Sequence, residues 1–134
     1  MHEAVGTGVV IGMPRLVLRC EGLALFGFGI AAFGSASLSW WLFAALFLAP
    51  DIGLAGYLAG PRIGAIAYNA LHTITLPVSL AALGLVGEST LLWSVAAVWT
   101  AHIGFDRMLG YGLKYSTESG HTHLGRIGRA SAAA

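Results

Sequence analysis

Four long apolar stretches separated by short turns constrain this chain more than any other feature. Each has roughly the 20 residues that a helix needs to cross a bilayer, and we predict spans at about 14–33, 38–59, 63–86 and 90–115. Only 10% of the 134 residues are charged, against about 25% in a soluble domain. Lipid-facing positions need no polar groups. The sequence therefore predicts an all-α bundle of four transmembrane helices, forming a single membrane domain over residues 1–134.

Basic residues indicate the orientation of this bundle. They gather on one side of the four predicted spans, at Arg15, Arg19, Arg62, Lys114, Arg126 and Arg129. The turns on the other side carry one acid, Glu88, and no basic residue. Because Lys and Arg mark the cytoplasmic side, we predict that the N- and C-termini are both cytoplasmic. Residues 116–134 then form a polar cytoplasmic tail, and we interpret His121–His123 as a solvated part of it.

Two spans contain features that bear on helix shape. Pro50 lies within the second span, where its missing N–H predicts a kink, and Pro77 lies within the third. The second span also carries Gly53, Gly56 and Gly60. Small residues in such a row let helix backbones approach closely in lipid. We therefore expect this row to face another helix.

Six polar residues interrupt the apolar spans and are the main candidates for function. They are Glu21, Asp51, Asn69, His72, His102 and Asp106. Counted from the cytoplasmic ends of their spans at a rise of 1.5 Å per residue, all six lie roughly 10–20 Å into the membrane. Charges at this depth are costly, so such residues usually face the bundle interior and mark a functional site. We predict one polar layer to which every span contributes.

The residue types in this layer favour three interpretations, which the sequence leaves open. In the first, a divalent metal (Zn, Fe or Mn) is bound by His72, His102, Asp106 and Asp51. In the second, a polar cavity without metal binds a small molecule or relays protons. In the third, the residues only form hydrogen bonds between helices. A haem between His72 and His102 is disfavoured, because the sequence has no other haem-specific feature.

Three classes of function follow from these interpretations. An enzyme would use His72, His102 and Asp106 as metal ligands or general bases on an apolar substrate, with Glu21, Asp51 and Asn69 contacting the substrate or orienting the ligands. A binding or transport module would hold a small molecule, an ion or a proton. An accessory subunit would join a larger complex, and a homo-oligomer is a further option.

The net charge of +1 without a basic stripe excludes a nucleic-acid partner, so the bilayer is the one partner that the sequence itself indicates.

Four short runs resemble a family of small bacterial membrane proteins, the domain of unknown function 4260. The runs are residues 49–53, 68–72, 102–115 and 122–125, and the likeness extends over about residues 14–126. The run from His102 to Tyr115 is the longest and most specific. The resemblance implies a multi-pass protein of the bacterial inner membrane, and it implies no particular reaction.

Overall fold

The structure, a computed structural model, describes residues 8–116 and 120–126. Within these residues the chain is mainly helical. The elements are α1 (Gly12–Ser35), α2 (Trp40–Phe47), the 3-10 helix η1 (Ala49–Ala59), α3 (Pro61–His72), α4 (Thr75–Val86), α5 (Thr90–Leu109) and the short strands β1 (His121–Thr122) and β2 (Gly125–Arg126). The strands form a two-stranded antiparallel hairpin.

Three helical segments are long and apolar enough to cross a membrane. They are Gly12–Ser35, Trp40–Ala59 and Pro61–Val86, the last two each made of two elements. Their outer faces carry large apolar side chains that are almost fully exposed, including Trp41, Leu58 and Val86. Exposure of such a surface to water is unfavourable, whereas contact with the hydrocarbon core of a bilayer is not.

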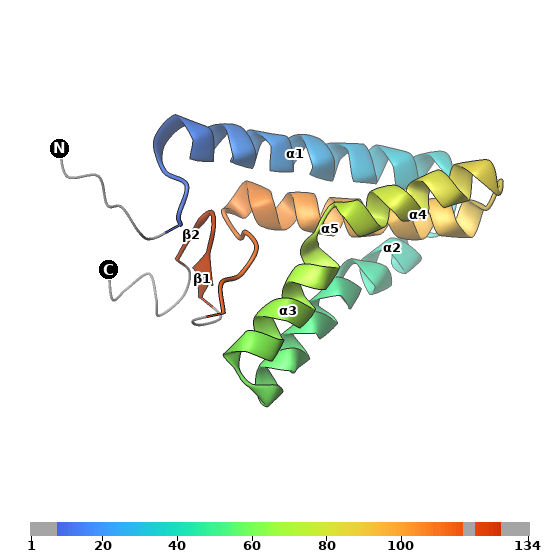
Figure 1. The fold of residues 1–134 in the computed structure, drawn as a ribbon. Helices are drawn as coiled ribbons and strands as arrows, with labels where there is room; N and C mark the ends of the chain where they lie inside the picture. The colour runs from blue at the N-terminus through green and yellow to red at the C-terminus, as the bar shows by residue number, and fades with distance from the viewer. Residues whose placement is uncertain (1–7, 117–119, 127–134) are drawn as a thin grey trace.

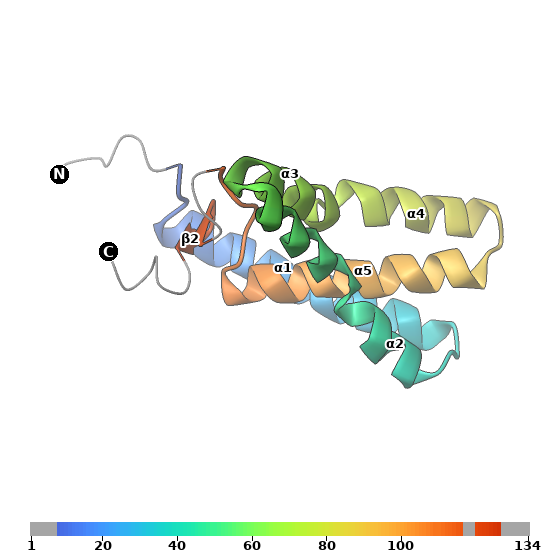
Figure 2. The ribbon, with the colours of Figure 1, turned by 90° about the horizontal axis from the view of Figure 1, so that it is seen from below.

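Helix α5 lies at the centre of the fold. In Figure 1 it runs antiparallel to α1, and in Figure 2 it lies between α4 and α2. Its buried side includes Ala97, Ala101, His102 and Gly104. Glycines let α1 and α5 approach closely, since a Cβ added to Gly29 would lie 2.6 Å from the carbonyl oxygen of Ala97. The helix that carries His102 and Asp106 is therefore the most enclosed one.

Two of these helical segments are broken, each within five residues before a proline. Helix α2 ends at Phe47 and Pro50 follows at the start of η1. Helix α3 ends at His72, and Pro77 lies in the first turn of α4. A proline ring clashes with the carbonyl four residues earlier, which is Leu46 in the first case and Thr73 in the second. The structure thus has the predicted irregularity near Pro50 and a second one that separates α3 from α4.

The segment after Pro50 continues as a 3-10 helix, and its glycines explain how it packs. Residues three apart share one face in a 3-10 helix, so Gly53 and Gly56 fall in one row. That row rests on α3: a Cβ added to Gly53 would lie 2.9 Å from the carbonyl oxygen of Ala67, and one added to Gly56 would lie 3.2 Å from the Cα of Gly64. Figure 1 shows this η1–α3 hairpin leaning away from α1 and α5.

The end of the fourth predicted span differs from the structure. We expected helix to about residue 115, but α5 ends at Leu109 because Gly110 adopts a left-handed conformation (φ 92°) that closes the helix. The chain then turns back, and the hairpin packs beside residues 112–115. Thr122 and Leu124 are fully buried there, so the interpretation of His121–His123 as a solvated tail is wrong. The rest of the predicted tail, at 117–119 and 127–134, lies outside the described residues.

Candidate metal centre

Four of the predicted polar residues meet at one point inside the bundle. Asp51 comes from η1, His72 from the last turn of α3, and His102 and Asp106 from one face of α5. One ligand atom from each lies within 4.8 Å of those of the other three. Only 4% of the His72 side chain and 3% of the His102 side chain are exposed, against 14% for Asp106 and 40% for Asp51. We call these four residues the His/Asp cluster.

Five of the six ligand–ligand distances in the His/Asp cluster are near those of a tetrahedral metal site, and the sixth, between Asp51 and Asp106, is within 4.8 Å. The two histidine Nε2 atoms are 3.1 Å apart. Asp106 Oδ2 lies 3.3 Å from Nε2 of His72 and 3.2 Å from that of His102, and Asp51 Oδ1 lies 3.5 and 3.3 Å from the same atoms. Zinc binds nitrogen and oxygen ligands at about 2.0–2.2 Å, which places neighbouring ligands of a tetrahedron roughly 3.3–3.6 Å apart. Five of the six ligand pairs therefore have nearly the separation that a bound zinc ion would impose.

The hydrogen bond on the far side of His72 leaves its cluster-facing nitrogen free to bind a metal. Nδ1 of His72 lies 2.8 Å from the carbonyl oxygen of Tyr68, and a carbonyl can only accept, so Nδ1 carries the hydrogen. When this ring binds a metal, Nε2 therefore supplies the lone pair. Such a second contact to a backbone carbonyl is typical of metal-binding histidines. The lone pair faces two carboxylates and another imidazole, and acceptors this close require a cation or a shared proton between them.

His102 is positioned by the break after α2. Its Nδ1 is buried beside the backbone of Phe47 without a hydrogen bond of good geometry. The Phe47 carbonyl has lost its helical partners, because Pro50 has no N–H and the Asp51 N–H donates to Leu48 instead. The ring of Phe47 also packs edge-on against His102 with centroids 5.2 Å apart. The break between α2 and η1 therefore positions Asp51 at the cluster and places the Phe47 backbone next to His102.

Tyr68 and Lys114 cover the cluster on the α3 side. The Tyr68 ring stacks on His72 with centroids 3.7 Å apart, and its hydroxyl lies 3.5 Å from Asp106 Oδ2. The Lys114 ammonium lies 4.3 Å from the centre of the same ring, a cation–π arrangement. Burial lowers the pKa of Lys114, while the carboxylates of Asp106 and Asp51 oppose that effect. Lys114 thus brings a positive charge close to an acidic centre without contacting its ligands.

The other two predicted site residues do not join the His/Asp cluster. Asn69 lies one residue along α3 from Tyr68 and clamps the backbone of Lys114: its amide donates to the Lys114 carbonyl (2.8 Å) and accepts from the Lys114 N–H (2.7 Å). It therefore holds the covering segment in place. Glu21 on α1 is exposed, and its charge interacts with Arg107. A shared depth was not enough to bring Glu21 inward, because depth does not specify the helix face.

Sequence reasoning missed three residues around the cluster. Tyr68 lies four residues before His72 and therefore on the same helical face, a spacing that could have identified it. Trp99, three residues before His102, could have been found in the same way. Lys114 could not, because its position depends on the left-handed turn at Gly110 and on the contact with Asn69 across 45 residues.

Comparison with known proteins agrees with the resemblance seen in the sequence. Residues 15–127 match the family described as a domain of unknown function (DUF4260). The chain belongs to this family. The matched region contains the whole His/Asp cluster, together with Tyr68, Trp99 and Lys114. Neither a curated protein nor a solved structure gives a match.

Proposed function

We propose that this chain is a metal protein of the bacterial inner membrane, with four spans and cytoplasmic termini, that binds zinc through the His/Asp cluster. The convergence of four ligand atoms, with five of their six separations between 3.1 and 3.5 Å, carries the proposal. Nitrogen and carboxylate ligands suit zinc, and iron or manganese as alternatives. A haem is disfavoured, because a porphyrin needs its two axial histidines on opposite faces and 3.1 Å between the Nε2 atoms leaves no room for it.

The unequal burial of the ligands supports a catalytic role on an apolar substrate. His72, His102 and Asp106 come from α-helices and are well buried, and two histidines with one carboxylate form a common catalytic zinc set. Asp51 comes from η1 and is the most exposed of the four. In the proposed enzyme, His72, His102 and Asp106 would hold the metal, and Asp51 would be the ligand that a substrate or water could replace. A zinc ion there would lower the pKa of bound water and polarise a substrate oxygen.

A second candidate is a module that binds or relays protons. The 3.1 Å separation of the two Nε2 atoms is also a hydrogen-bond distance, so a proton could join the two rings where the enzyme would hold a metal. The carboxylates of Asp51 and Asp106 would then stabilise the added charge. This candidate uses the same four residues without any metal.

Metal analysis of the purified protein separates the two candidates. The protein is extracted in mild detergent and dialysed against buffer with zinc. Its zinc content per chain is then measured by elemental mass spectrometry. We expect one zinc per chain in the natural protein and less than a tenth of that in His72→Ala/His102→Ala. His121→Ala is the control, since His121 lies in the hairpin outside the cluster, and it should keep its zinc.

The metal proposal fails if the natural protein remains metal-free while correctly folded. It also fails if the double variant keeps one zinc per chain, since the metal would then be bound elsewhere. Circular dichroism and gel filtration of each variant report folding independently of metal. Folded, metal-free protein would favour the proton-binding candidate.

A further inference from the structure

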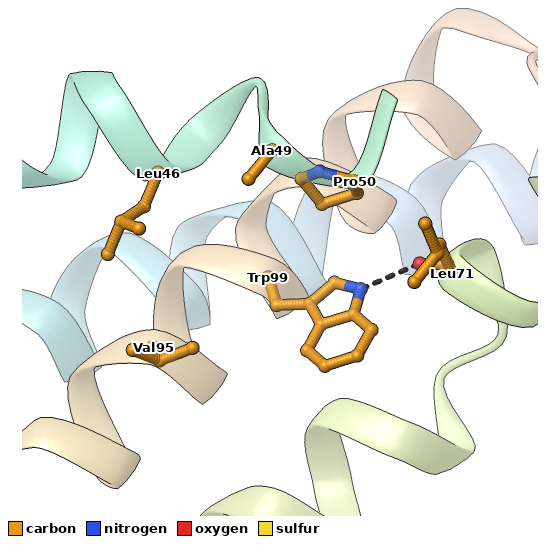
Figure 3. Close-up of a pocket in the computed structure, with 6 residues that line it drawn as sticks. All are labelled: Leu46, Ala49, Pro50, Leu71, Val95 and Trp99. Carbon is orange, nitrogen blue, oxygen red and sulfur yellow. Dashed lines mark hydrogen bonds between the residues drawn. The ribbon is translucent and has the colours of Figure 1, made fainter. Parts of the chain in front are cut away.

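An apolar cavity lies directly behind the His/Asp cluster. It has a volume of about 210 Å³ and is lined by Leu46, Ala49, Pro50, Leu71, Val95 and Trp99, whose side chains surround it in Figure 3. Pro50 and Leu71 immediately precede Asp51 and His72 in the sequence. Trp99 lies three residues before His102 on α5. The cavity and the cluster are therefore built from adjoining residues of the same three segments.

The cavity exists because two spans break at the same level. Leu46, Ala49 and Pro50 flank the break between α2 and η1, and Leu71 precedes the break between α3 and α4. Unbroken helices would continue through this space.

A hydrogen bond fixes the wall of the cavity on the α5 side. The Trp99 indole donates to the Leu71 carbonyl oxygen at 2.6 Å (Figure 3). That carbonyl is free because the Thr75 N–H, its partner in a continuous helix, donates to the Thr73 hydroxyl. The large ring of Trp99 is therefore held across the gap between α3 and α5, with its only polar atom satisfied.

The lining chemistry indicates what the cavity holds. All six lining residues are apolar or aromatic, and only Pro50 among them is fully buried, so the cavity opens at the surface. The surface beside it is apolar too, with Leu48 65% and Leu91 60% exposed. At this depth the surroundings are lipid hydrocarbon. This volume is below the roughly 300–1,000 Å³ of drug-sized pockets, so the cavity holds a short stretch of hydrocarbon and not a complete long chain.

We propose that this cavity binds the first part of the hydrocarbon chain of a long-chain fatty acid, next to its carboxylate, and that the carboxylate lies at the His/Asp cluster. This inference rests on the proposed metal site and names its substrate class. A carboxylate is an ordinary zinc ligand, and Asp51, the most exposed ligand, lies between the cavity wall at Pro50 and the metal position. The fatty acid enters sideways from the bilayer with its carboxylate first, and the rest of its chain stays in the bilayer.

Photolabelling tests the proposal. Zinc-loaded protein in phosphatidylcholine nanodiscs is illuminated with palmitic acid that carries a diazirine on the part of its chain next to the carboxylate, and the labelled residues are mapped by mass spectrometry. We expect labels to concentrate at residues 46–50 and 95–99. Val95→Phe fills the cavity without touching the cluster and should lower this labelling at least fivefold. Val78→Phe, a change of the same size at an exposed position on α4, should leave it unchanged.

Removal of zinc tests the position of the carboxylate. If the carboxylate binds the metal, stripping with a chelator should lower palmitate labelling of the cavity several-fold, and labelling by a diazirine alkane without a carboxylate should not change. Labels spread evenly over the exposed apolar faces, or labelling insensitive to Val95→Phe, would overturn the proposal. So would palmitate labelling that zinc removal does not alter. Zinc content, measured on the same samples, shows separately whether the metal site itself has failed.

Discussion

At the scale of single residues, the four members of the His/Asp cluster are not equivalent. Asp106 extends from the rigid central helix four residues after His102 and is mostly buried, whereas Asp51 follows a proline in a 3-10 segment and is 40% exposed. An exposed carboxylate on a less regular segment reorients at lower cost. The two aspartates should therefore contribute differently to metal binding, although both lie 3.2–3.5 Å from the histidine nitrogens.

Matched asparagine variants test this difference. Asp51→Asn should weaken zinc binding about 10-fold and Asp106→Asn about 100-fold or more, on the scale known for groups that support metal sites. Competition with a chromogenic chelator measures both affinities in the same detergent. Equal losses would show that Asp51 is as firm a ligand as Asp106, and the site would then be a closed, structural one.

His123 gives a residue-scale prediction on pH. Burial lowers its pKa, with a further contribution from Arg107, and its Nδ1 accepts a hydrogen bond from the Leu113 N–H at 2.8 Å. Protonation of Nδ1 would remove that bond. Since the unfolded histidine has a pKa of about 6.5, the unfolded state binds more protons below this pH, and the local stability of the hairpin should fall as the pH drops from 7 to 5.

Hydrogen exchange at the Leu113 amide measures this effect. Its protection, corrected for the intrinsic exchange rate at each pH, should decrease between pH 7 and pH 5 in the natural protein. The His123→Asn variant offers an oxygen acceptor that does not titrate at these pH values, so its protection should stay constant. A natural protein and variant that respond alike would show that another group controls the hairpin.

At the scale of elements, the glycines of α1 distinguish a packed face from a lipid face. A Cβ at Gly29 would lie 2.6 Å from the Ala97 carbonyl oxygen and 2.7 Å from the Ala101 Cβ, whereas a Cβ at Gly27 would meet nothing within 4 Å. Gly29→Leu should therefore separate α1 from α5 and destabilise the fold by about 1–3 kcal/mol or more. Gly27→Leu should be neutral or stabilising, since leucine is the better helix former.

Thermal unfolding in detergent, followed by tryptophan fluorescence, compares the two variants. Both changes give the same gain in helix propensity, so the difference between their midpoints reports packing alone. Midpoints that agree within error would mean that α1 does not pack on α5 as described.

The elements also show how far sequence reasoning extends. Apolar length and turn residues predicted the outer bounds of the four helical segments within about two residues, except the end of α5. These bounds depend on local chemistry: Ser39 and Ser89 cap α2 and α5. The shared depth of six polar residues predicted that they would meet, and four of the six do so in the His/Asp cluster. The 3-10 form of η1, the early end of α5 and the buried hairpin were not predictable, because they depend on contacts between segments far apart in the chain, such as Gly53 with Ala67 and Asn69 with Lys114.

At the scale of the whole molecule, the proposed four-span orientation can be tested by cysteine accessibility. Cys20 is exposed, so the background variant is Cys20→Ser. Ala36→Cys and Glu88→Cys lie in the turns at one end of the bundle, and Arg62→Cys lies at the start of α3. A membrane-impermeant maleimide applied to spheroplasts should label the first two and reach the third only after permeabilisation. Labelling of all three from outside would overturn the four-span orientation.

The central position of α5 has a consequence for how the chain is made. Three helical segments are apolar enough to enter a bilayer by themselves, and α5 is not among them. It carries His102, Asp106 and Arg107, whose transfer into lipid is unfavourable for an isolated helix. In the proposed four-span arrangement α5 follows the three apolar segments in the sequence, so these segments would already be in the membrane when α5 enters it. The fourth span would therefore insert only as part of the assembling bundle.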